Sequence, residues 1–187
     1  LVADKNNHRL VRFDKNINYI TTFPDANTGV ELYYPIDIEI TKDGVIFILQ
    51  ENNFEILKLN PDNNSFDIIG ENVKKEFQLI EPLDIFLTKN EELFVLEKSG
   101  KILSFDRYGT PLRIWKKPEL TFTGRKIIVS EGHIFLLDSS TIYVLQEQNW
   151  VSVFSTDEYL ITDFSTSDNK LYLLSRSGKI LVCEPEK

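Results

Sequence analysis

Short apolar runs alternate with polar turns along the whole chain, and one pair of these runs recurs five times. The first run of each pair is continuously apolar, which is typical of a strand buried on both faces. The second run mixes apolar and polar side chains and ends on an acidic or amide residue. This pattern predicts hairpins within an internal repeat. The second runs lie at 8–14, 54–60, 100–106, 140–146 and 178–184.

Two further strands flank most of these pairs, so each repeat holds four strands, which we name a, b, c and d. A four-stranded antiparallel unit that recurs about every 40 residues is the signature of a β-propeller blade. We therefore predict an all-β propeller. Strand b is the continuous run, at 45–49, 93–96, 134–137 and 171–174, with only 1–3 in the first copy. Strand a is expected at 36–41, 83–88, 126–130 and 160–166, strand c at the second runs, and strand d at 19–23, 66–69, 112–115 and 150–154.

Tight turns join the predicted strands. A glycine after a small polar residue supplies the positive φ that hairpin turns need, as in Asp43-Gly44, Ser99-Gly100 and Ser177-Gly178. No segment has a sustained helical period, and the best helical candidate is the short stretch 73–80.

The predicted repeats do not add up to a closed ring. The first copy holds strands b, c and d and the last holds a, b and c, so the two partial copies overlap. We expect one propeller domain or fragment, 1–187, with five blades' worth of a six-bladed ring; five irregular blades with frayed ends are the alternative. Leu1 is not the expected translation start, because the chain has no methionine. The blades are expected at 1–23 (partial), 34–70, 81–116, 120–155 and 159–187 (partial).

The first copy contains Ala3-Asp4 and Asn7-His8-Arg9, and it closes on Phe13-Asp14. In these residues it resembles the NHL repeat of six-bladed propellers. Later copies keep the shape, with Pro35-Ile36-Asp37 and Pro82-Leu83-Asp84 opening strand a, but they lose the Asn-His-Arg. The resemblance spans nearly the whole chain. It implies fold more than function, because NHL-like propellers include protein-binding scaffolds, RNA-binding domains, sugar-lactone hydrolases and amidating lyases.

Composition narrows the classes of partner. The formal net charge of −8 repels phosphate backbones, so nucleic acid is not an expected partner. No apolar stretch approaches the roughly 20 residues of a membrane-spanning helix. The single cysteine, Cys183, excludes an intrachain disulfide framework and is expected to be a packed thiol of strand c. An extracytoplasmic location is slightly favoured over a cytoplasmic one, because a signal segment could precede Leu1.

Four residues align near the middle of strand a, which is the innermost strand of a propeller blade, and are expected to line the central channel. Carboxylates that converge there could bind Ca²⁺ or Zn²⁺, and in lactonase-type relatives such a cation polarises a carbonyl or activates water. The alternative is that each aspartate accepts hydrogen bonds from backbone N–H groups at the neck of its blade. A lysine in the ring favours a charge pair, so no cofactor is expected. The four residues are Asp37, Asp84, Lys126 and Asp163.

The d-to-a and b-to-c connections share one face, and the long d-to-a loops lie at 24–34, 70–81 and 116–123. Exposed aromatic side chains between polar loops are common protein-contact anchors. Packing over the core between blades is the alternative for each of them. The candidates are Tyr33, Tyr34 and Phe77 in these loops and Trp115 and Trp150 on strand d.

No catalytic residue is assigned. His8 and His133 lie in different turn positions, and no zinc-protease, nucleophile-elbow or phosphate-loop motif occurs. We expect a non-enzymatic propeller scaffold for protein–protein interaction, as a subunit of a larger complex. The alternative is a metal-dependent hydrolase or lyase of the lactonase-like type that uses the channel carboxylates. The sequence does not indicate a small-molecule ligand.

Overall fold

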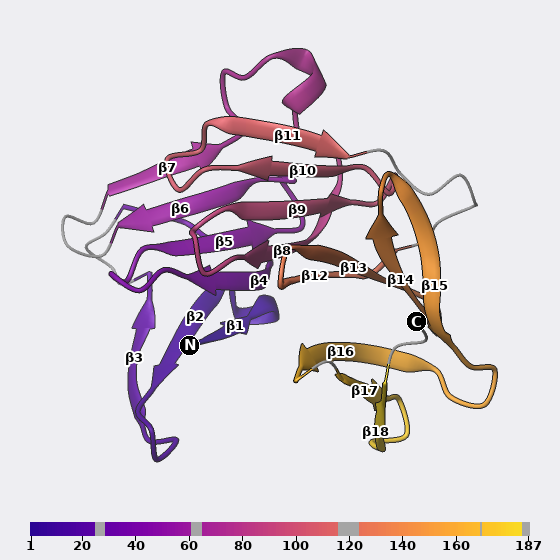
Figure 1. Cartoon of the computed structure of the whole chain (residues 1–187). Helices are drawn as coiled ribbons and strands as arrows, with labels where there is room; N and C mark the ends of the chain where they lie inside the picture. Colours follow the sequence, from indigo (N-terminus) through magenta and orange to yellow (C-terminus); the bar gives the residue numbers. More distant parts are fainter. Residues whose placement is uncertain (25–28, 61–64, 116–123, 169, 185–187) are drawn as a thin grey trace.

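The computed structural model describes residues 1–24, 29–60, 65–115, 124–168 and 170–184. In these ranges the regular structure is almost entirely β, and it forms five antiparallel sheets. The sheets stand side by side along an arc, from blade 1 at the N-terminus (indigo) to blade 5 at the C-terminus (yellow) (Figure 1). The predicted all-β propeller architecture is confirmed.

Strand order within each sheet follows the chain, so every blade is an antiparallel meander. Blade 1 holds β1 (Val2–Asp4), β2 (Arg9–Phe13) and β3 (Tyr19–Phe23). Blade 2 holds β4 (Pro35–Ile40), β5 (Ile46–Gln50), β6 (Ile56–Asn60) and β7 (Ser65–Ile69). Blade 3 holds β8 (Pro82–Leu87), β9 (Leu93–Glu97), β10 (Ile102–Phe105) and β11 (Pro111–Trp115). Blade 4 holds β12 (Lys126–Ser130), β13 (His133–Asp138), β14 (Thr141–Gln146) and β15 (Asn149–Ser155), and blade 5 holds β16 (Ile161–Ser167), β17 (Lys170–Ser175) and β18 (Ile180–Cys183).

The partial copies fall where the repeat predicts them. Blade 1 contains strands b, c and d, blade 5 contains a, b and c, and the three middle blades contain all four. Each strand lies within two residues of its expected bounds. The helical candidate 73–80 contains one turn of 3-10 helix, η2 (Lys75–Phe77), and a second turn not expected from the pattern is η1 (Lys5–Asn7).

The core is divided into layers between neighbouring blades. Along β9, Leu93 and Val95 pack toward blade 2, whereas Phe94 and Leu96 pack toward blade 4. Alternating residues of a strand point to opposite faces, so a strand covered on both faces must be apolar at every position. This explains why strand b is a continuous apolar run. Corresponding layers join blade 1 to blade 2 and blade 4 to blade 5.

The inner strands of successive blades contact one another, β1 with β4, β4 with β8, β8 with β12 and β12 with β16. These contacts place the strand a residues of blades 2 to 5 along the inside of the arc (Figure 1). The predicted turn glycines have positive φ, +92° at Gly44, +81° at Gly100 and +82° at Gly178. Among the described residues, no helix has the length and apolarity needed to cross a bilayer.

Candidate functional site

The four residues predicted for the channel occupy one register position in their blades. Asp37 pairs with Leu49, and each of the other three pairs with the matching leucine of its own strand b. Alignment of the sequence repeats therefore placed them correctly relative to one another. The three further pairs are Asp84 with Leu96, Lys126 with Leu137, and Asp163 with Leu174.

A β-bulge precedes each aspartate of this set. The pairing register shifts between Pro35 and Asp37, and the same shift occurs immediately before Asp84 and Asp163. The strand that carries Lys126 pairs with its neighbour without a shift. Because a bulge turns the side chain that follows it, the three bulges re-aim the carboxylates relative to a regular strand. The repeat pattern gave no sign of this irregularity.

The re-aimed carboxylates accept hydrogen bonds from the next blade. The backbone N–H of Ile85 in blade 3 donates to Asp37 Oδ2 at 3.1 Å, and that of Ile127 in blade 4 donates to Asp84 Oδ2 at 2.7 Å. Asp37 Oδ1 accepts a second bond from the N–H of Ile38 in its own strand, at 2.9 Å. These contacts match the expectation that the aspartates serve the blade necks, and each of the two joins consecutive blades.

Lys126 takes a different part in the ring. Its Nζ lies 3.1 Å from Asp163 Oδ1, so the charge pair expected from the lysine is present. Burial by itself would lower the pKa of Lys126, but the nearby carboxylates of Asp84 and Asp163 outweigh burial and raise that pKa. Lys126 therefore stays positively charged and offsets part of the negative charge of the ring.

Burial raises the pKa of two carboxyl groups in the channel. The pKa of Asp84 is raised well above its usual value, first by burial and then by the charge of Asp37. The pKa of Glu39 is raised to about 7, again mainly by burial. The Ile127 N–H bond needs only an acceptor oxygen, which Asp84 offers in either protonation state. The cluster combines carboxyl groups of raised pKa with one lysine, and among the described residues no group of three His, Cys, Asp or Glu side chains is placed to hold a metal ion.

The d-to-a face carries apolar side chains on a fixed backbone. The N–H of Tyr33 donates to Gln50 Oε1 at 2.6 Å, and the N–H of Ile80, at the equivalent place before blade 3, donates to Glu97 Oε1 at 2.8 Å. Gln50 and Glu97 are both 1% exposed, whereas Tyr33 is 41% and Ile80 67% exposed. We call each of these two hydrogen bonds a latch, because it holds the loop backbone in place and leaves the apolar side chain in solvent. Ile80 and this hydrogen bond were not expected from the sequence, although Tyr33 and Ile80 each lie two residues before a proline.

The remaining aromatic candidates are less accessible than Tyr33. Tyr34 has a positive φ of 53° and its ring contacts the edge of the His8 ring, with centroids 4.3 Å apart. Phe77 is half-buried and packs against the layer between blades 2 and 3. Trp115 and Trp150 are half-buried against the layer between blades 3 and 4, with the Trp115 ring 5.0 Å from Phe94. Packing against the layers between blades accounts for the position of Phe77, Trp115 and Trp150, and the contact with His8 accounts for that of Tyr34.

Cys183 is half-buried against the layer between blades 4 and 5, and burial raises the pKa of its thiol. His8 lies in a turn, where it ends η1 with a φ of 53°, and its Nδ1 is 3.2 Å from the backbone oxygen of Leu32. Among the described residues, neither side chain belongs to a group of three His, Cys, Asp or Glu that could hold a metal ion. Both match the packed-thiol and turn roles expected of them.

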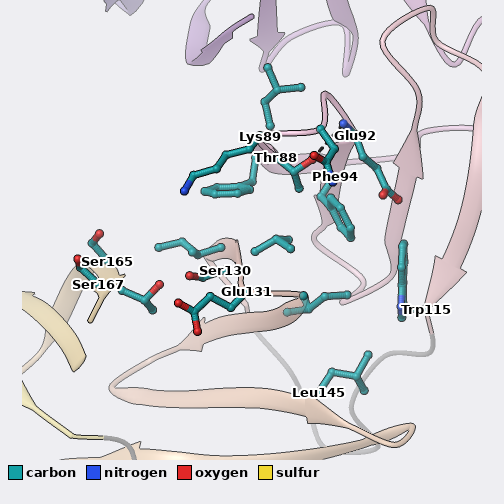
Figure 2. Close-up of a pocket in the computed structure, with 18 of the residues that line it drawn as sticks. Thr88, Lys89, Glu92, Phe94, Trp115, Ser130, Glu131, Leu145, Ser165 and Ser167 are labelled. Carbon is teal, nitrogen blue, oxygen red and sulfur yellow. Dashed lines mark hydrogen bonds between the residues drawn. The ribbon is translucent and has the colours of Figure 1, made fainter. Parts of the chain in front are cut away.

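An open cleft of about 930 Å³ lies on the opposite face, where the a-to-b turns of blades 3, 4 and 5 converge. Figure 2 shows Ser165 and Ser167 on one side of it and Trp115 and Leu145 on the other, with Glu131 between them. Its rim mixes charges of both signs, and the N–H of Glu92 donates to Thr88 Oγ1 at 3.1 Å. The polar a-to-b turns were visible in the sequence, but their convergence depends on the curvature of the arc.

No protein-family model matches the chain, and no curated protein matches its sequence. Solved structures share its fold at low identity. A streptogramin B lyase is 12% identical with a TM-score of 0.64 over 98% of this chain and 64% of the lyase. The virginiamycin B lyase from Staphylococcus aureus is 13% identical with a TM-score of 0.64 over 98% of this chain and 68% of the lyase. The computationally designed Ika4 protein is 12% identical with a TM-score of 0.57 over 80% of this chain and 89% of Ika4.

Identities this low indicate a common fold and carry no activity to this chain. The chain spans about two thirds of the length of the lyases that it matches. The NHL-repeat type, for which no family model matches, stays a prediction. The structure and its likeness to these solved structures assign the chain to the β-propeller fold.

Proposed function

We propose that the chain is a binding module that holds a protein partner on its d-to-a face, with Tyr33 and Ile80 as anchors. The observation that carries this proposal is the pair of buried latches, from Gln50 and Glu97, beneath two exposed apolar side chains. An anchor on a fixed backbone loses little conformational entropy when it is buried by a partner. Large exposed apolar side chains at fixed positions are the usual centres of protein interfaces.

Other contacts extend this surface. Tyr159 ends the d-to-a loop before blade 5, at the position equivalent to Tyr33, and Lys179 Nζ lies 5.0 Å from the centre of its ring. Phe54, in the b-to-c turn of blade 2, is also exposed on this face. The Tyr33 hydroxyl donates to Glu31, so the rim next to the anchor is acidic. We expect a partner segment with apolar side chains flanked by basic residues.

The test is affinity capture with the purified chain and a matched exposed residue as control. Tyr33→Asp with Ile80→Asp should remove the captured partner. Tyr108→Asp should retain it, because Tyr108 is 72% exposed on the opposite face, in the c-to-d turn of blade 3. Circular dichroism should show that all three proteins are folded. Capture of the same partner by wild type and by the double variant would contradict the proposal.

One observation supports the alternative of a metal-dependent hydrolase or lyase. It is the cluster of Asp37, Asp84 and Glu39, in which the pKa values of Asp84 and Glu39 are raised. Two properties weigh against it: burial and the charge of Asp37 favour the neutral form of Asp84 over the carboxylate that a cation needs, and its Oδ2 already accepts the Ile127 N–H. If Ca²⁺ or Zn²⁺ bound there, it would raise the melting temperature by mass action on the native state. A shift at millimolar metal that Asp84→Asn removes would favour this reading over a binding module.

A further inference from the structure

Side chains bridge the gap between blades 2 and 3 on the face of the a-to-b turns, whereas the gap between blades 3 and 4 is open there. Arg107 of blade 3 lies 2.5 Å from Asp43 of blade 2 and 2.6 Å from Glu91 of its own blade. Tyr108 of blade 3 also contacts blade 2, with Lys58 Nζ 5.5 Å from the centre of its ring. The cleft of about 930 Å³ lies over the next gap, where no salt bridge joins blades 3 and 4 among the described residues.

The cations that bridge the first gap are replaced at the second. Lys58 and Ser104 are equivalent, because each pairs with the phenylalanine of its own strand b. Ser104 is 0% exposed, and its hydroxyl has no hydrogen-bond partner among the described residues. Counted from the same register pair, Glu147 of blade 4 stands where Arg107 stands in blade 3. A serine and a glutamate therefore replace the lysine and the arginine, and the gap stays open.

A run of hydroxyl side chains lines one end of the cleft. Ser165, Thr166 and Ser167 lie on β16, the innermost strand of blade 5. At the positions of the first two, residues 86–87 of blade 3 and 128–129 of blade 4 are all apolar. Thr166 Oγ1 is buried and has no hydrogen-bond partner among the described residues. A blade that departs in this way from the packing pattern of its repeat indicates a functional site.

Two opposite charges face this hydroxyl end. Lys89 and Glu131 hold the same place in the a-to-b turns of blades 3 and 4, and both are exposed. Within the described parts of the chain, neither forms a salt bridge. Figure 2 shows that both side chains reach toward Ser165 and Ser167. Asp168, at the same place in blade 5, also lines the cleft and adds a second carboxylate.

Apolar side chains form the other end of the cleft. Trp115 and Leu145 lie there, away from Ser165 and Ser167 (Figure 2). The Trp115 ring packs on Phe94, with centroids 5.0 Å apart, and is half-buried. The cleft is therefore amphipathic along its length, with a charge pair and hydroxyls at one end and an aromatic wall at the other.

We infer that this cleft binds the zwitterionic head of an α-amino acid that has a large apolar side chain. Lys89 pairs with the carboxylate and Glu131 with the ammonium group, through charge-assisted hydrogen bonds. The hydroxyls of Ser165 and Ser167 bond to the same head, and the apolar side chain packs against Trp115. A volume of about 930 Å³ is within the range of small-molecule sites and also admits a larger molecule that carries the same head.

Other ligand classes fit the charges less well. A phosphate or a dicarboxylate would bring a second anion against Glu131, and a polyamine would bring a second cation against Lys89. A neutral sugar would leave both charges without partners when it displaced their water. The cleft lies on the face opposite the d-to-a loops, so this inference does not rest on the proposed function.

Calorimetric titration of the whole chain with L-phenylalanine tests the inference. Lys89→Met and Glu131→Gln should each weaken binding at least about tenfold, because each removes one charge-assisted hydrogen bond. Lys42→Met is the matched control and should bind as wild type does, since Lys42 is exposed at the same turn position of blade 2. Trp150→Phe leaves Trp115 as the only tryptophan, so a change in its emission on titration locates the ligand in the cleft.

Modified ligands separate the two charges of the head. N-acetyl-L-phenylalanine has no ammonium group and L-phenylalanine amide has no carboxylate, so wild type should bind each at least about tenfold more weakly than phenylalanine. Glu131→Gln should not weaken binding of the N-acetyl form any further, because both changes remove the same ion pair. No binding of phenylalanine at millimolar concentration, or equal affinity for the amide, would overturn the inference. Tighter binding of maltotriose would also overturn it, since the cleft would then be a sugar site.

Discussion

Replacing Asp84 tests whether the channel carboxylates hold the blades together. Asp84 is 8% exposed, and its Oδ2 accepts the N–H of Ile127, a residue that is fully buried. Asp84→Ala would leave that N–H without an acceptor in a place that water does not reach. A buried unsatisfied donor costs about 1–3 kcal/mol. For a domain of this size, a loss of about 2 kcal/mol lowers the melting temperature by about 4–8 °C.

Asp84→Asn separates the hydrogen bond from the charge. Burial and the charge of Asp37 raise the pKa of Asp84 well above its usual value, so both favour the neutral form of this side chain, which asparagine resembles. The asparagine amide keeps an oxygen for Ile127 and a donor toward Asp37, so it should cost less than about 0.5 kcal/mol. Urea and thermal unfolding of wild type, Asp84→Ala and Asp84→Asn measure both differences.

Two results would refute this reasoning. If Asp84→Ala unfolds with the wild-type midpoint, the Ile127 N–H does not depend on Asp84. If Asp84→Asn is as unstable as Asp84→Ala, the negative charge matters and the acceptor role is wrong. Asp163→Ala is the internal control, since no blade follows its own blade within the part of the chain that the structure describes. It should cost less than Asp84→Ala.

Three further predictions concern pH and packing. The Glu39 pKa is raised from 4.5 to about 7, so the folded state holds this proton more tightly than the unfolded chain does. The contribution of protonated Glu39 to the free energy of unfolding is present below pH 4.5 and is lost between about pH 4.5 and 7. After a discount for solvent screening, Glu39→Gln should reduce the change in unfolding free energy over this pH range by about 1 kcal/mol, measured by urea unfolding. Parallel pH profiles of the two proteins would contradict this. Arg107 bridges Asp43 of blade 2 at 2.5 Å and Glu91 of blade 3 at 2.6 Å, and its hydrogen bond lowers the Asp43 pKa to about 2. The stability that the Arg107–Asp43 ion pair contributes is present above pH 3.8 and is lost as the pH falls through 2. The urea midpoints of wild type and Arg107→Ala should therefore differ at pH 6 and converge at pH 2. Phe105→Ala, in the layer between blades 2 and 3, should cost about 3–5 kcal/mol by thermal or urea unfolding, whereas Phe13→Ala on the open face of blade 1 should cost less than half as much.

The strands and their roles could be predicted from the sequence because they depend on local patterns. A continuous apolar run such as 93–96 requires cover on both faces, and a Ser-Gly turn sets the hairpin that follows. The same logic identified the partial first and last blades and aligned Asp37 with Asp84. Both inferences use spacing along the chain, which the repeat records directly.

The bulges, latches and cleft became visible only in the tertiary structure. Asp84 and Asp163 occupy equivalent positions in similar strands, yet one is buried against a following blade and the other is not. Ile80 was missed as an anchor because its fixed backbone depends on Glu97, which lies in the next blade. The sequence by itself determined which side chains need cover, because pleat alternation and turn chemistry act over a few residues. Only the packing of blade against blade decided which of these side chains are covered, because the contacts between blades join residues more than 40 positions apart, such as Asp84 and Ile127.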